Sequence, residues 1–225
     1  MSPPARPTPA PMAGAALVLP AEPPPLAQVE QLVHASARIH GHLCPGQVIG
    51  VRMSILGLGL LGYGCPLGMP EIKNIIGFVE IERCLADAVA VASGLRFGRG
   101  SLRLINQGLL AATFLDALSG RAVRLVSREE ARQAALELHP NESNPHTAQV
   151  LAYRVMPDAE LFDAQWVSVA LPPDQMPGVR PPKVPCANCG VLIRSGQVHR
   201  VEGRELCAPC AGRAYFLPVA PPTKE

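Results

Sequence analysis

Two Cys-x-x-Cys pairs near the C-terminus constrain the fold of this chain more than any other feature. Seventeen residues separate the first pair, Cys186 and Cys189, from the second pair, Cys207 and Cys210. This is the spacing of a zinc ribbon. So short a segment cannot bury a useful hydrophobic core, and zinc held by the four thiolates is expected to supply the folding free energy. Four protein ligands close a tetrahedral shell, and the sequence therefore predicts a structural zinc site here.

Short alternating segments lie between the two cysteine pairs. Val191–Ile193 and Val198–Val201 are expected to form one hairpin. His199 is an alternative zinc ligand, but it lies inside this hairpin, and the four cysteines already complete the shell. Contact with a partner or a nucleic acid is a second role for the module, although it has no aromatic platform for base stacking. The charges that would serve such a contact are Arg194, Arg200, Arg204 and Arg213.

Prolines divide the chain into modules. Residues 1–25 contain nine prolines and are expected to be a disordered arm. Prolines recur over 172–182, which is expected to be a linker between a main domain over 26–171 and a zinc ribbon over 183–214. Residues 215–225 are expected to be a tail. The chain is long enough for one ordinary domain and one small module.

Composition and charge exclude several classes of protein. The chain is 48% hydrophobic but only 4% aromatic, so the core is expected to consist of aliphatic side chains. The main domain has 12 Lys and Arg against 13 Asp and Glu, which argues against a nucleic-acid partner. The apolar stretch Val48–Leu61 is too short to span a bilayer and contains Arg52, so we expect a buried core helix and no membrane partner.

Cysteine usage indicates the compartment. Outside the two pairs, the chain has Cys44, Cys65 and Cys84, an odd number that argues against a secreted disulfide framework. The start of the chain lacks a basic segment followed by an apolar one, so no signal peptide is expected. These patterns favour metal ligation in a reducing compartment, and we expect a cytoplasmic protein.

The hydrophobic periodicity of the main domain switches repeatedly between helix and strand, which predicts an α+β fold with a mixed helix and sheet core. The expected helices are Leu26–Ile39, Gly46–Leu61, Leu85–Ser93, Gln107–Leu118 and a helix that begins with the capping box Ser127-x-x-Glu130 and runs to Leu138. The expected strands are Asn74–Ile81, Ser101–Ile105, Ala122–Val126, Gln149–Met156 and Gln165–Leu171.

A second group of candidate ligands lies near the front of the main domain. His40, His42 and Cys44 fall within five residues. Pro45 is a good residue to open a helix, so the Cys44 sulfur should lie near a helix N-terminus, where the dipole favours thiolate. The two imidazoles would project the same way if their segment is extended. A thiolate and an imidazole at this separation can share one divalent metal.

Cys84 and Asp87 strengthen this candidate site. Cys84 follows a predicted strand and leads into a predicted helix, a common location for ligands and catalytic groups. Asp87 lies three residues later, so both side chains share a face if the helix begins at Cys84. Cys65 is expected to be a small buried hydrophobe.

The heptapeptide His-Gly-His-Leu-Cys-Pro-Gly at 40–46 resembles the motif of the FmdE-like family, which is related to formylmethanofuran dehydrogenase. Segments 80–88, 93–100 and 119–123 resemble the same family, and many members carry a four-cysteine ribbon after the core. The resemblance implies an α+β core that commonly forms a homodimer, with a metal-binding cavity at the His/Cys motif. Members commonly have Lys where this chain has Arg99.

Carried over residue by residue, the resemblance marks His42 and Cys44 first, then Cys84 and Asp87, and His40 last. We therefore expect a divalent transition metal, zinc first, bound by His42, Cys44 and Cys84. Asp87 and His40 would be a general base or additional ligands, and Cys44 and Asp87 are the candidate catalytic residues. The metal would activate a water molecule or a carbonyl group.

Two other functions remain open. The first is a non-catalytic accessory subunit that docks through the ribbon to an oxidoreductase containing molybdenum or tungsten. The second is a ribbon-based transcription regulator, which the neutral main domain disfavours. A family resemblance does not supply a substrate.

Overall fold

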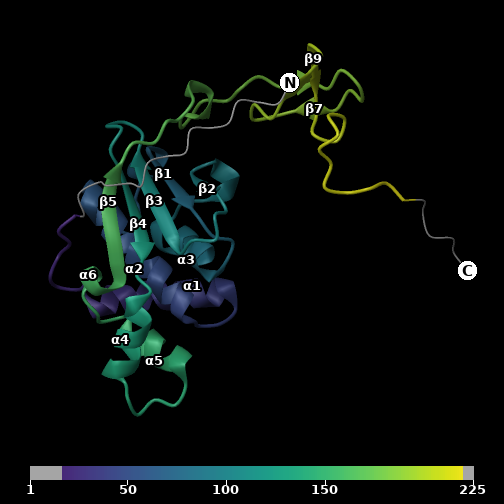
Figure 1. Cartoon of the computed structure of the whole chain (residues 1–225). Helices are drawn as coiled ribbons and strands as arrows, with labels where there is room; N and C mark the ends of the chain where they lie inside the picture. Colours follow the sequence, from purple (N-terminus) through teal and green to yellow (C-terminus); the bar gives the residue numbers. More distant parts are fainter. Residues whose placement is uncertain (1–16, 220–225) are drawn as a thin grey trace, which may run out of the picture. The chain divides into compact units, whose positions relative to one another are not determined.

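A computed structural model describes residues 17–219, which divide into two compact units (Figure 1). The first unit ends at Ala170 and the second begins at Leu171. Each unit is described separately below. Within the expected arm and tail, residues 1–16 and 220–225 lie outside the described part of the chain.

The first unit contains a five-stranded mixed sheet with the strand order β2-β1-β3-β4-β5. Strands β1 and β2 are parallel, and the other neighbouring pairs are antiparallel. In the middle of β1, Gly77 pairs with Leu102 on one side and with Phe114 on the other. The strands are β1 (Ile75–Val79), β2 (Leu102–Leu104), β3 (Ala111–Asp116), β4 (Ala122–Ser127) and β5 (Phe162–Val167).

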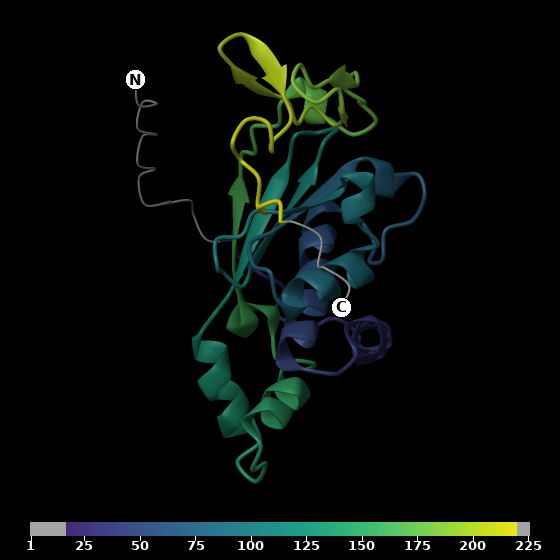
Figure 2. The same ribbon diagram turned by 90° about the vertical axis from the view of Figure 1, so that its right-hand side faces the viewer.

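Helices cover one face of this sheet and extend beyond one of its ends (Figures 1 and 2). Helix α2 contacts β3 and β4, while α3 connects β1 to β2 and packs against both α1 and α2. Helices α4 and α5 pack on each other where β4 ends and β5 begins. The helices are α1 (Leu26–His40), α2 (Pro45–Leu61), α3 (Cys84–Ser93), α4 (Glu130–Leu138), α5 (Pro145–Ala152) and α6 (Asp158–Leu161). The mixed helix and sheet fold is as predicted.

Helix α2 forms the centre of the core. Pro45 occupies its first turn, and Gly62 ends it in the left-handed conformation with φ 90°. At Gly57 the helix lies so close to the sheet that a Cβ would be 2.4 Å from the Phe114 ring. Its apolar residues are buried, as expected for a core helix, and Arg52 is buried with them.

The Arg52 side chain connects α2 to the segment around α6. Its guanidinium forms an ion pair at 2.7 Å with Asp158 and donates to the carbonyl oxygens of Tyr153 and Met156 at 2.6 and 2.7 Å. A buried charge is tolerated only when it is paired and hydrogen-bonded. These contacts join residues about one hundred positions apart in the sequence.

Two predicted elements are wrong. The sequence predicts a helix over Gln107–Leu118, but the second half of this segment is strand β3, which pairs with β1 and β4 on its two sides. The sequence predicts a strand over Gln149–Met156, but its first residues belong to α5, whose N-cap Asn144 accepts a hydrogen bond from the His146 N–H. A central sheet position and a capped helix start outweigh the local hydrophobic pattern in the two cases.

Smaller details also differ from prediction. The last predicted strand begins earlier, so β5 covers Phe162–Val167. Helix α4 is present, but Ser127 ends β4, the N-cap is Glu129, and no side chain caps the helix, so the predicted capping box is wrong. Within the proline-rich arm, Leu17 and Leu19 pack against the core, and the Leu17 N–H donates to the Ala164 carbonyl at 3.0 Å.

The second unit contains two separate two-stranded sheets rather than the single hairpin predicted. Strand β7 (Leu192–Ile193) pairs with β6 (Val184–Pro185), and β8 (His199–Val201) pairs with β9 (Arg204–Leu206). Each cysteine pair thus follows its own short sheet or lies within its turn. The small core of this unit consists of Cys186, Ile193 and Leu206.

Among residues 17–219, no helix has both the length and the apolar character needed to cross a bilayer.

Candidate metal centre

Three potential metal ligands converge in the first unit. One donor atom from each of His40, Cys44 and Cys84 lies within 4.8 Å of the other two. They come from the end of α1, the N-cap of α2 and the first residue of α3. The fold therefore brings Cys84 to a motif that lies forty residues earlier in the sequence.

Local sequence explains how α1 and α2 meet at this point. Helix α1 stops at Gly41, whose φ of 95° lies in the left-handed region that favours glycine. The chain then reverses within a few residues, and Pro45 begins α2 directly after Cys44. Residues 40 to 44 are consequently a sharp turn, not the extended segment that would point both histidines the same way.

Two glycines allow α2 and α3 to approach closely enough for the cysteines to meet. A Cβ on Gly46 would lie 3.0 Å from the Cys84 Cβ and 3.9 Å from the Cys44 sulfur. One turn later, a Cβ on Gly50 would lie 2.5 Å from the Ala88 Cβ. Any larger residue on this face of α2 would push the two helix N-termini apart.

The His40 ring is held by Asp87. Its Nδ1 lies 2.8 Å from Asp87 Oδ2, and the His40 side chain is only 16% exposed. The other ring nitrogen, Nε2, is buried and has no hydrogen-bond partner among the described residues. A buried nitrogen without a partner is costly, and a metal would satisfy it. As predicted, α3 begins at Cys84, so Cys84 and Asp87 lie on one face of that helix.

The two histidines have the opposite arrangement to the one expected. His40, which the resemblance places last, belongs to the converging group, whereas His42, which it places first, is exposed and lies outside the group. The His42 ring packs on the His40 ring with centroids 4.7 Å apart. The reason is the turn at Gly41, which leaves His40 on the last turn of α1 and carries His42 outward.

Burial raises the pKa of the Cys84 thiol above its ordinary value, and the neighbouring Cys44 acts in the same direction. A metal ion at this position would supply the positive charge that favours the thiolate form. Because the thiol proton must leave before coordination, metal affinity at these donors should increase with pH.

Gln47 is a neighbour of the site to which sequence patterning does not point. It is fully buried in the first turn of α2, and its side-chain amide donates to the Cys84 carbonyl at 2.8 Å. A polar residue inside an otherwise apolar helix is the one sequence signal of its role.

Cys65 does not belong to the group. It is partly buried against the core, and its thiol contacts the Ala92 carbonyl at 3.3 Å. Burial raises the pKa of the Cys65 thiol to about 12. This cysteine is therefore an unreactive packing residue, as predicted.

The second group of potential ligands is in the second unit, where one sulfur from each cysteine of the two pairs lies within 4.8 Å of the others. The Cys207 N–H donates to the Cys186 sulfur at 3.3 Å, and the Asn188 amide donates to the Cys210 sulfur at the same distance. Backbone N–H groups, those of Cys207 first, lower the pKa of Cys186 to about 6. These four sulfurs could hold a metal ion, and His199 is not one of the grouped donors.

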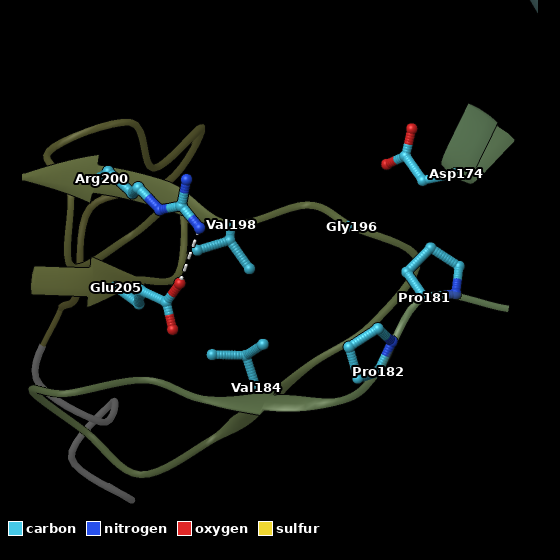
Figure 3. Close-up of a pocket in the computed structure, with 8 residues that line it drawn as sticks. All are labelled: Asp174, Pro181, Pro182, Val184, Gly196, Val198, Arg200 and Glu205. Carbon is cyan, nitrogen blue, oxygen red and sulfur yellow. Dashed lines mark hydrogen bonds and ion pairs between the residues drawn. The ribbon is translucent and has the colours of Figure 1, made fainter. Parts of the chain in front are cut away.

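A hollow of about 550 Å³ lies elsewhere in the second unit (Figure 3). Val184 and Val198 face each other across it, and the ion pair between Arg200 and Glu205 closes one end. None of the four cysteines lines it. The remaining lining residues are Asp174, Pro181, Pro182 and Gly196.

Comparison with known proteins identifies the family. The sequence model of the family described as "FmdE, Molybdenum formylmethanofuran dehydrogenase operon" matches residues 39–163, more than half of the chain. The chain belongs to the FmdE family. The matched segment contains all residues of the front group, from His40 to Asp87, while the ribbon of this FmdE protein lies outside it.

Two individual proteins resemble this FmdE protein. A "Probable S-adenosyl-L-methionine-binding protein" of Archaeoglobus fulgidus is 29% identical over 212 residues, which are 86% of this chain. The match covers 56% of that relative, so the chain spans little more than half its length. The crystal structure of a tungsten formylmethanofuran dehydrogenase FmdE-like protein from Syntrophus aciditrophicus superposes with a TM-score of 0.57. It is 22% identical and the match covers 84% of this chain and 95% of that one, which shows a shared fold.

Proposed function

We propose that this FmdE-family chain is a metalloprotein whose core binds one divalent transition metal through His40, Cys44 and Cys84. The observation that carries this proposal is the convergence of three donors from three different helices, together with the buried His40 Nε2 that has no partner among the described residues. Two thiolates and one imidazole are a donor set suited to zinc. Zinc is therefore the metal we propose.

Asp87 would orient the His40 ligand. By accepting a hydrogen bond from Nδ1, it fixes the ring so that Nε2 faces the two sulfurs. The Asp87 side chain is 52% exposed, so its carboxylate is also accessible to solvent and to a reacting molecule. We assign Asp87 a second role as a general base on this ground.

Three protein ligands leave a tetrahedral metal with one open position, as in catalytic zinc sites. When bound there, the metal would supply Lewis acidity toward a water molecule or a carbonyl group. The exposed His42 ring lies against His40 and can hold or move a proton at the solvent side of the site. The reaction would belong to one-carbon metabolism or to metabolism that uses molybdenum or tungsten enzymes, in the cytoplasm, with the chain as a homodimer.

The ribbon would hold a second, structural zinc through its four cysteines. Purified protein should then contain two metals per chain, and Cys44→Ala should contain one. Elemental analysis measures both values. One equivalent in the wild-type chain, unchanged by Cys44→Ala, would rule out the front site.

Cobalt substitution tests the individual ligands. The spectrum of the Cys44→Ala chain contains the ribbon alone, so its subtraction from the wild-type spectrum isolates the front site. The isolated thiolate–cobalt charge-transfer band should weaken in Cys84→Ser and keep its thiolate intensity in His40→Ala. If Cys84→Ser leaves both the band and the affinity unchanged, Cys84 is not a ligand. The name of the Archaeoglobus relative makes S-adenosyl-L-methionine the first small molecule to add to this site.

A second candidate function is a non-catalytic accessory subunit that docks through the ribbon to a molybdenum or tungsten oxidoreductase. It is supported by the exposed apolar side chains of the second unit, among them Val191, Leu192 and Val201, which are 53%, 44% and 42% exposed. Addition of azide to the cobalt protein separates the two functions. An open coordination position predicts a change in the front-site spectrum, whereas a closed site in an accessory protein predicts none.

A further inference from the structure

Gln47 is a polar residue in the middle of the apolar core. Its relative exposure is 0%, and its neighbours Val48 and Ile49 in α2 are buried apolar residues. Burying an amide costs free energy unless its donor and acceptor atoms are satisfied. The fold must therefore supply partners, and the identity of these partners shows what Gln47 does.

Gln47 makes one hydrogen bond to each cysteine of the front site and one to α1. Its backbone N–H donates to the Cys44 carbonyl at 3.0 Å, and its side-chain N–H donates to the Cys84 carbonyl at 2.8 Å. Its side-chain oxygen accepts from the hydroxyl of Ser36, a residue that is also fully buried. Ser36 lies one helical turn before His40 on α1.

These contacts connect the three helix ends that carry the proposed ligands. We propose that Gln47 is a positioning residue that fixes the separation of the Cys44 and Cys84 sulfurs, with Ser36 as its anchor on α1. The inference rests on the proposed function, since it assigns the residue that shapes the metal site. Gln47 itself is not a ligand, because its side-chain nitrogen and oxygen are both occupied by protein partners.

Metal coordination makes this positioning measurable. Metal–ligand distances in a well-formed site are fixed to within about 0.2 Å, while helices that only pack against each other can shift by more. Gly46 permits α2 and α3 to come close, but it does not determine where along α3 the first residue lies. The hydrogen bond from Gln47 to the Cys84 carbonyl determines that position.

A purely structural role is the alternative, in which Gln47 only fastens the helices. Two matched pairs of variants distinguish these roles in the full chain. Gln47→Met, which keeps the size and removes the amide, is compared with Leu58→Ala, which destabilises the same helix at a fully buried position away from the site. Ser36→Ala is compared with Ser54→Ala, because both remove one buried hydroxyl group and Ser54 bonds only to its own helix at Gly50.

The measured quantities are the front-site cobalt affinity, by competition with a chelator, and the charge-transfer band after subtraction of the Cys44→Ala spectrum. Gln47→Met should weaken the affinity by about 10–100-fold, as expected for a partner that orients ligands, and should shift the band. Ser36→Ala should weaken it less, and should add nothing in the Gln47→Met background. Leu58→Ala and Ser54→Ala should lower or keep the melting temperature without changing affinity.

If Gln47→Met lowers the melting temperature but leaves affinity and band as in Leu58→Ala, Gln47 only fastens helices and the inference is wrong. Additive effects of Ser36→Ala and Gln47→Met would remove Ser36 from the proposal. Failure of the proposed function has a different outcome, because the wild-type chain would then show no front-site cobalt band at all.

Discussion

His40 Nδ1 lies 2.8 Å from Asp87 Oδ2, although the two residues are 47 positions apart in the chain. The contact joins the last turn of α1 to the first turn of α3. It turns the free nitrogen of His40 inward, toward Cys44 and Cys84. A carboxylate behind a ligating imidazole fixes the ring and increases its basicity.

Asp87→Asn should weaken metal binding at the front site by about 10–100-fold, because the neutral amide orients the imidazole less well. Any activity should fall further than affinity if Asp87 is also a general base. Chelator competition gives the affinity. Asp163→Asn, which changes an exposed carboxylate on β5, is the control and should have no effect. Equal affinities for Asp87→Asn and the wild type would mean that the contact plays no part in metal binding.

Removal of the Arg52 side chain should strongly destabilise the first unit. Arg52→Met would leave the buried Asp158 carboxylate without its ion-pair partner, which typically costs about 3–5 kcal/mol. Urea unfolding followed by the fluorescence of Trp166, the single tryptophan of the chain, measures the change.

The double variant Arg52→Met with Asp158→Ala is the matched control for this experiment. It should recover part of the loss, because burial already raises the pKa of Asp158 and makes its charge unfavourable without Arg52. A double variant no more stable than Arg52→Met would show that the bonds of Arg52 to the Tyr153 and Met156 carbonyls matter more than the ion pair.

Truncation after Leu171 should leave a folded protein that retains the front metal. The large core cluster lies entirely before Leu171, and the small core around Cys186 lies after it. Circular dichroism and elemental analysis of the truncated chain should therefore show an ordered protein with one metal. Aggregation or loss of that metal would show that the ribbon stabilises the first unit.

Asp116 should make stability depend on pH. Burial alone would raise its pKa, but hydrogen bonds from the Ser119 hydroxyl and from the N–H groups of Leu118 and Ser119 outweigh this and lower it. A carboxylate with a lowered folded pKa stabilises above its unfolded pKa of about 4, and this contribution is lost as pH falls through the folded value. Asp116→Asn should thus be less stable than the wild type at neutral pH.

The difference between Asp116→Asn and the wild type should shrink on acidification to about pH 3. Unfolding of both chains in the presence of a chelator, at the two pH values, removes the contribution of metals. A difference that stays constant with pH would mean that the Asp116 charge does not stabilise the β3–β4 turn.

Local sequence determined where the main helices begin and end. Gly41 ends α1 and Pro45 opens α2, because glycine tolerates the left-handed conformation and proline lacks the N–H that a first helical turn leaves unpaired. The cysteine spacing of the ribbon was also readable, since paired Cys-x-x-Cys turns require only a few residues each. These features depend on neighbours in sequence.

Tertiary structure decided the elements whose local pattern was ambiguous. The apolar run that became β3 has no distinct helical or alternating period, and its pairing with β1 and β4 at the centre of the sheet made it a strand. In α5 the local signal of Asn144 followed by Pro145 was present, but the alternating residues after it favoured a strand. The single predicted ribbon hairpin became two sheets, because each cysteine pair has its own partner strand.

The sequence alone also named the residues that could share the front site, but not which of them meet. Spacing placed His40 and His42 on equal terms, and only the turn at Gly41 separated a buried histidine from an exposed one. Cys84, Asp87 and Gln47 reach the site through the packing of α3 on α1 and α2. Such contacts depend on how helices approach in space, and this distance is set by packing between residues far apart in the chain.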